Sequence, residues 1–155
     1  MSIIESILRD HPFFAELEHD DIELIAEHST NVRFEPDTYI FRQGEPANQF
    51  YLITYGKVAI EAFSPERGPL TVLTVAEGEV LGWSWLFEPY IWHFDARTVD
   101  MTRAIAINGE KLRAQCEQNH ELGYQLMRRG VHVVEQRLQA AMIQLLDLYS
   151  VQGAV

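Results

Sequence analysis

The chain has 155 residues, a length that suits one hydrophobic core and excludes a large multidomain enzyme. Hydrophobic residues make up 47% and charged residues 23% of it, a balance that excludes a disordered or collagen-like chain. With 12 basic and 23 acidic residues the formal net charge is −11, which disfavours binding to a nucleic acid backbone.

Cysteine content and hydropathy set further limits. Cys116 is the only cysteine, so an internal disulfide and a cysteine-based zinc cluster are excluded and a reducing compartment is favoured. No apolar run approaches the roughly 20 residues of a membrane-spanning helix, and the first residues lack the basic start of a secretory signal. We therefore expect a cytoplasmic protein without a membrane segment.

Residues 1–31 are predicted to form two short helices. The first ends at His11 and Pro12, because proline lacks a backbone donor and disfavours helical geometry in the residue before it. The second has an apolar stripe that includes Leu17, Ile22 and Ile25, which predicts one buried face.

Residues 32–108 are predicted to form a β domain, because short β-like runs alternate there with Gly, Pro, Asn and Asp. In the fourth run apolar residues concentrate on one of the two alternating faces, which should point inward. The six runs are Thr38–Phe41, Gln49–Thr54, Lys57–Phe63, Leu70–Val75, Phe94–Val99 and Thr102–Ile107.

Residues 109–155 are predicted to form a short and a long helix, separated at residues 118–120. Apolar residues in the long helix recur at alternating steps of three and four, which is the pattern of a helix that pairs with a copy of itself. Packing of this seam on the β domain is the alternative. Gly130 within the helix predicts a bend or a close contact. The seam consists of Tyr124, Met127, Val131, Val134, Leu138, Ala141, Leu145 and Leu148.

Four motifs in this order carry a resemblance to a known family. They are the segment 41–47 (FRQGEPA), the segment 50–58 (FYLITYGKV), the segment 78–82 (GEVLG) and the pair Leu86-Phe87. The chain resembles, over about residues 13–149, a cyclic-nucleotide-binding domain of the catabolite activator protein (Crp/Fnr) superfamily. The resemblance implies a mainly β fold with flanking helices, in which an eight-stranded jelly-roll β-barrel holds a ligand pocket and a long C-terminal dimer-type helix follows.

The resemblance places a phosphate-binding cassette at residues 78–98, and two of its contacts are missing. Gly78 and Gly82 hold the glycine positions of the family. The family's glutamate for the ribose hydroxyl is replaced by Trp83, which offers a donor and no acceptor. The family's arginine for the cyclic phosphate falls on Trp92 or His93. Binding of cyclic AMP or cyclic GMP is therefore expected to be weakened.

Two charged residues near the cassette have competing interpretations. Glu79 matches a family residue that supports the loop, and we interpret it as structural. Arg97 is the nearest arginine after the cassette. It reaches a phosphate, or it forms a surface ion pair with Asp95 or Asp100, which is the more common situation for such a residue.

Aromatic side chains crowd residues 83–94, although they make up only 11% of the chain. They fill the barrel mouth under the long helix, or they reshape the pocket for a flatter and less anionic ligand with Ser84, Tyr90 and His93 as polar groups. An exposed patch for a protein partner is a third interpretation. The candidate pocket comprises Gly78, Glu79, Gly82, Trp83, Ser84, Trp85, Tyr90, Trp92, His93 and Arg97.

Neither catalytic nor metal-binding motifs stand out. No glycine-flanked serine, phosphate loop or paired carboxylate motif is found, and the histidines lack metal-ligand spacing. Cys116 is interpreted as a buried helix residue, and haem held by a histidine is a minor alternative. We expect no enzyme activity and no metal.

The function expected from these features is that of a stand-alone sensor or regulatory domain. A ligand would move the cassette against the long helix, bias the dimer seam and signal to a partner protein. Regulators of this superfamily continue into a helix-turn-helix domain, whereas this sequence stops at Val155, so direct DNA binding is not expected. The alternative is a ligand-free interaction module whose pocket is plugged by Trp83, Trp85 and Trp92.

Overall fold

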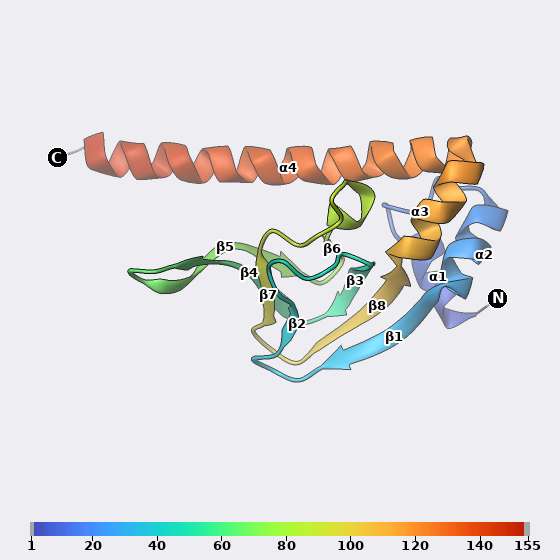
Figure 1. Ribbon diagram of the computed structural model, residues 1–155, viewed down its shortest axis with the longest axis horizontal. Coiled ribbons are helices and arrows are strands. Elements are labelled where there is room, and N and C mark those ends of the chain that lie inside the picture. The colour runs from blue at the N-terminus through green and yellow to red at the C-terminus, as the bar shows by residue number, and fades with distance from the viewer. Residues whose placement is uncertain (1, 154–155) are drawn as a thin grey trace.

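The computed structural model describes the backbone of residues 2–153 and the side chains of residues 2–150 (Figure 1). Helices α1 (Ile3–Asp10) and α2 (His19–Glu27) come first, and helices α3 (Gly109–Gln118) and α4 (His120–Gly153) come last. Between them lie two four-stranded antiparallel sheets. The predicted fold class is confirmed. Residues 1, 154 and 155 of the predicted domain ranges lie outside the described residues.

The strands pair in the orders β1-β8-β3-β6 and β2-β7-β4-β5. Each strand that was predicted individually is present, with ends that differ by at most two residues from the prediction. The first strand of the chain begins at Ser29, inside the range predicted to be helical. The bounds are β1 Ser29–Phe34, β2 Tyr39–Phe41, β3 Gln49–Tyr55, β4 Lys57–Ser64, β5 Gly68–Ala76, β6 Val80–Leu81, β7 Asp95–Thr98 and β8 Thr102–Asn108.

The central strands β3 and β8 of the first sheet are buried on both faces over most of their length, which explains their nearly continuous apolar sequences. On β3, Phe50 and Leu52 point toward α1, α2 and α3 and belong to the helix-side core. Tyr51 and Ile53 alternate with them and belong to the core between the two sheets. A strand that reads as one apolar run in sequence therefore serves two cores.

Strand β5 has the predicted inward row only near its end. Leu73 and Val75 pack toward the inter-sheet core. Leu70 and Val72 remain 39% and 42% exposed. The β4–β5 hairpin extends past the rest of the second sheet (Figure 1).

Helix α4 crosses the molecule along one side (Figure 1), and its buried residues do not belong to the heptad seam. Leu122 and Leu126 are fully buried in the helix-side core. A Cβ built on Gly130 would lie 3.0 Å from Cδ1 of Leu86, so this glycine provides a close contact and not a bend. The side chains of residues 141–150 are all exposed. The second half of α4 thus leaves its apolar residues uncovered.

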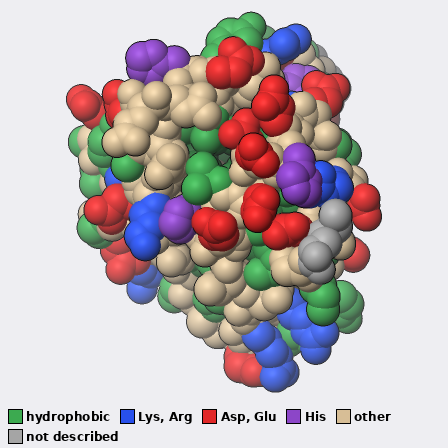
Figure 2. Space-filling view, turned by 90° about the vertical axis from the view of Figure 1, so that its right-hand side faces the viewer, with side chains coloured by type: hydrophobic (Ala, Val, Ile, Leu, Met, Phe, Trp, Pro, Cys, Tyr) green, Lys and Arg blue, Asp and Glu red, His purple; other side chains and the backbone are tan. Residues whose placement is uncertain are grey.

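Acidic side chains gather at one end of the domain (Figure 2). Figure 2 shows acidic side chains gathered over the end formed by α1, α2 and α3. Burial raises the pKa of the Asp21 carboxyl there, and the nearby charges of Glu18, Asp20 and Glu121 raise it further.

Candidate functional site

The cassette begins with a loop that Glu79 supports. Gly78 has φ +85°, and its amide donates to the carbonyl of Ile53 at 2.8 Å. The amide of Ile53 donates in turn to the carbonyl of Glu79 at 3.0 Å, and the Glu79 carboxylate accepts from the amide of Ala76 at 3.1 Å. Every one of these contacts holds the turn between β5 and β6, in agreement with the structural interpretation of Glu79.

The second cassette glycine is packed against Trp92. Gly82 has φ +92°, and a Cβ built on it would lie 2.5 Å from Cη2 of Trp92. The indole is 5% exposed and stacks on Phe41 with 3.8 Å between ring centroids and 9° between planes. Its backbone is held by hydrogen bonds with Gly44 and Glu45. Trp92 therefore occupies the interior of the barrel directly beside the cassette.

The side chain of Trp85 packs into the helix-side core and not into the interior of the barrel. It is 2% exposed and stacks on Phe50 at 4.4 Å with 4° between the rings, in the core under α3. Its carbonyl accepts a 2.6 Å hydrogen bond from Arg113, whose guanidinium also lies 4.0 Å over the ring of Tyr90. These contacts attach the cassette to α3. Arg113 was not anticipated, because a single arginine in a short helix carries no pattern.

Trp83 lies at the rim of the barrel beside Arg137 of α4. The guanidinium stands 4.6 Å over the indole, and Nη2 donates to the carbonyl of Val80. Burial lowers the pKa of Arg137 to about 10, an effect that the charge of Glu79 opposes. Sequence reasoning missed Arg137, although it follows Gly130 by two helical turns and therefore shares the barrel-facing side of α4.

A groove of about 400 Å³ opens between the barrel mouth and α4, and we call it the barrel-mouth groove. Five predicted pocket residues line it: Gly82, Trp83, Ser84, Trp92 and His93. The seam residues Val134, Leu138 and Ala141 line its helix side. The structure thus brings together half of the predicted pocket and one segment of the seam.

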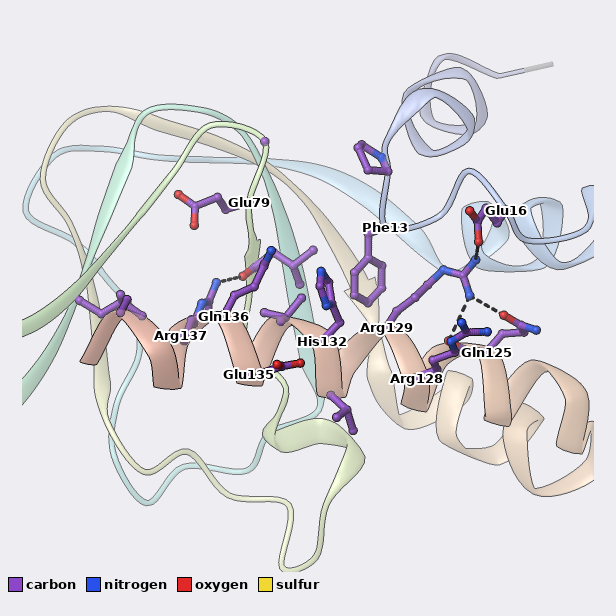
Figure 3. Close-up of a pocket in the computed structure, with 17 residues that line it drawn as sticks. Phe13, Glu16, Glu79, Gln125, Arg128, Arg129, His132, Glu135, Gln136 and Arg137 are labelled. Carbon is purple, nitrogen blue, oxygen red and sulfur yellow. Dashed lines mark hydrogen bonds and ion pairs between the residues drawn. The ribbon is translucent and has the colours of Figure 1, made fainter. Parts of the chain in front are cut away.

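A second groove, of about 790 Å³, runs between the N-terminal segment, the β5–β6 turn and α4 (Figure 3). We call it the cassette–helix groove. Gly78 and Glu79 line this groove and not the first one. At one end Arg129 pairs with Glu16 at 3.7 Å and donates to Gln125, and at the other end lies Arg137 (Figure 3). Arg137 borders both grooves.

Trp85, Tyr90 and Arg97 line neither groove. Arg97 donates to both carboxylate oxygens of Glu61, at 3.1 and 2.8 Å, and to Asp37 at 2.8 Å, and these contacts raise its pKa. The predicted partners Asp95 and Asp100 were wrong. Asp95 lies on the same face of β7 as Arg97 but accepts from the amide of Gln43 and pairs with Arg42, whereas Arg97 reaches Glu61 on the neighbouring strand β4.

Two further predictions concern metals and thiols. Among the described residues, His19, Asp20 and Glu23 bring ligand atoms within 4.8 Å of one another, but all three are exposed and His19 already contacts Arg9 at 2.8 Å. Cys116 is half-buried, and burial raises its pKa to about 11. A thiol with this pKa is a poor nucleophile at neutral pH.

Residues 31–119 match the family of cyclic nucleotide-binding domains. This chain belongs to that family. The anaerobic regulatory protein of Bacillus subtilis is 29% identical over 110 residues, which are 70% of this chain and 46% of that protein. The CRP-like cAMP-activated global transcriptional regulator of Mycobacterium tuberculosis is 26% identical over 145 residues, which are 94% of this chain and 63% of that protein. The chain thus spans about half to two thirds of these relatives.

The structural comparison supports the same assignment. A crystal structure described as a cyclic nucleotide-binding protein from Geobacter metallireducens is 32% identical, with a TM-score of 0.80 over 89% of this chain and 99% of that one. The family resemblance to Crp/Fnr regulators is therefore confirmed.

Of the helices in the described part of the chain, none has the length and apolar character that a membrane crossing requires.

The tryptophans at residues 83 and 92 supply aromatic surface on two sides of the barrel-mouth groove. Trp83 contributes its ring to Arg137. Trp92 stacks on Phe41. Among the described residues that line this groove, Arg137 carries the one guanidinium.

Proposed function

We propose that this domain is a non-enzymatic sensor or regulatory module with an altered phosphate-binding cassette, which signals through α4 to a partner protein. One observation carries the proposal: α4 contacts the cassette with one face and leaves most of its heptad seam exposed beside that face. Trp83 and Leu86 contact this face, at Arg137 and Gly130. Tyr124, Val131, Leu145 and Leu148 are each more than half exposed beside it.

Dimerisation through the seam is the physical basis of the proposed output. Exposure of a row of apolar residues to water costs free energy, and the pairing of two copies of the helix buries that row. A change in the cassette that shifts α4 would alter the register or angle of that pairing. The regulatory names of the relatives are consistent with such a role.

Light scattering of the purified chain tests this proposal. We expect a dimer at micromolar concentration and a monomer for Leu145→Glu, because Leu145 is 52% exposed on the seam and contacts neither groove. Gln139→Glu, which adds the same charge to an exposed position outside the seam, is the control and should remain a dimer. A monomeric wild type, or a dimeric Leu145→Glu variant, would contradict dimerisation through the seam.

Thermal unfolding with millimolar cyclic AMP or cyclic GMP tests the altered cassette. A ligand at 100 times its dissociation constant stabilises a protein by about 2.7 kcal/mol, and each kcal/mol raises the midpoint of such a domain by roughly 2–4 °C. We expect little or no shift, also for Trp83→Glu, because the phosphate arginine is still missing. A clear shift with this variant would show that an arginine already present serves the phosphate.

A ligand-free interaction module is the second candidate, and the position of Trp92 favours it. The indole fills the space between Phe41 and Gly82. Trp85 does not contribute to this plug, because it lies in the helix-side core. The remaining 400 Å³ of the barrel-mouth groove supports the sensor proposal instead.

A further inference from the structure

Arg137 is a half-buried cation without a carboxylate partner. Among the described residues, no carboxylate oxygen lies within 4.0 Å of its nitrogens, although five other basic side chains have such a partner. Within the part of the chain that the structure describes, its only hydrogen bond is to the carbonyl of Val80, and Trp83 covers one face of the guanidinium. Proteins rarely bury a charge without a counter-ion.

The loss of hydration at this position is substantial, since burial outweighs the opposing charge of Glu79 and lowers the pKa of Arg137. Glu79 itself is engaged with the amide of Ala76. The guanidinium can still donate toward the grooves, because it holds five donor hydrogens and the structure uses one of its nitrogens.

The groove beside Arg137 is apolar. Its lining contains Phe41, Val72, Trp92, Phe94 and Leu138, and its polar side chains are Ser84, His93, Arg137 and Gln144. A volume of about 400 Å³ is in the range of small-molecule sites. A cyclic nucleotide would place ribose hydroxyls and a polar base against these rings, with few partners for its hydrogen bonds.

We propose that the barrel-mouth groove binds an apolar molecule with a single acidic group, whose acid group pairs with Arg137. The inference rests on the proposed sensor function and specifies its ligand class. Apolar surface of the ligand would cover the exposed Val72 and Leu138, and the acid group would supply the missing counter-ion. Binding would also join the cassette to α4, because Trp83 and Arg137 both border the groove.

Calorimetric titration of the full chain with decanoate and with the neutral decanol tests the charge requirement. We expect decanoate to bind at least about tenfold more tightly than decanol, the equivalent of one charge-assisted hydrogen bond. Arg137→Gln should remove this preference. Arg128→Gln is the matched control, because Arg128 is an exposed arginine of α4 that does not line the barrel-mouth groove, and it should retain the preference. Equal binding of decanoate by wild type and Arg137→Gln would overturn the role of Arg137.

If Arg137→Gln fails to fold, a second variant tests whether the probes bind in the barrel-mouth groove. Val72 lies on β5, is 42% exposed and lines the groove, so Val72→Trp fills the groove without a change in charge. This variant should bind neither probe. Undiminished binding by Val72→Trp, or no binding of decanoate by the wild type, would overturn the proposal.

The ligand class and the sensor function fail in different ways. A thermal shift with cyclic AMP and none with decanoate overturns the ligand class and leaves a ligand-responsive domain. Binding of decanoate by a chain that light scattering finds monomeric supports the ligand class and contradicts signalling through the seam.

Discussion

The two cassette glycines allow a direct test of the packing beside the groove. Both have positive φ, +85° at Gly78 and +92° at Gly82. A Cβ on Gly78 would meet nothing within 4 Å, whereas one on Gly82 would lie 2.5 and 2.8 Å from two ring carbons of Trp92. Alanine at either position therefore has the same backbone strain, and only Gly82→Ala adds a steric clash.

The expected loss in free energy of unfolding follows from the backbone strain and the steric clash. A left-handed backbone costs a residue with a Cβ roughly 1–2 kcal/mol, which is the whole effect expected for Gly78→Ala. Overpacking in a well-packed core adds about 1–3 kcal/mol, so Gly82→Ala should lower the free energy of unfolding by about 2–5 kcal/mol. The difference between the two variants measures how tightly Trp92 closes the interior.

Urea unfolding followed by far-ultraviolet circular dichroism is the appropriate assay, since fluorescence would change with any substitution of Trp92. The clash should be relieved by Trp92→Leu, which removes the ring carbons nearest Gly82. In that background Gly82→Ala should cost about as much as Gly78→Ala, a coupling of at least about 1 kcal/mol. Equal costs for Gly78→Ala and Gly82→Ala in the wild type, or an unchanged cost after Trp92→Leu, would refute the reasoning.

Two further predictions concern charges. Arg97→Gln leaves the 3% exposed Glu61 without its bidentate partner and should lower the free energy of unfolding by about 2–3 kcal/mol, less than for a fully buried pair because Arg97 is 29% exposed. Adding Glu61→Gln should recover most of this loss in urea unfolding, and no recovery would contradict the ion-pair account. The raised pKa of Asp21 means that the folded state binds this proton more tightly than the unfolded state does. The protonated carboxyl therefore adds to the free energy of unfolding below the ordinary pKa of 3.8, and this gain is lost as the pH rises through the folded-state pKa. Asp21→Asn should therefore unfold a few degrees higher than wild type at neutral pH, and the gap should close below pH 3.8; a gap that persists there would contradict the electrostatic cause.

The local elements of this protein could be predicted from its sequence. The step from β-like runs to helical spacing at Asn108 and Gly109 marks the end of β8 and the start of α3. The break at residues 118–120 separates α3 from α4. Turn residues, capping residues and hydrophobic periodicity act over a few neighbouring positions, so they can be recognised in one chain without knowledge of its partners. The order of the family motifs, and the tryptophan that follows Gly82, are equally visible in the sequence.

The tertiary structure decided which side chains meet. Trp85 and Trp92 lie in the same aromatic segment, yet one joins the core under α3 and the other the interior of the barrel. Arg137 is separated from Val80 by 57 residues and becomes a half-buried cation only because α4 crosses the cassette. Periodicity predicts that a helix has a buried face, but the contacts of that face depend on the register and angle at which distant elements pack. The burial of a charge, and hence its need for a counter-ion, arises only from that packing.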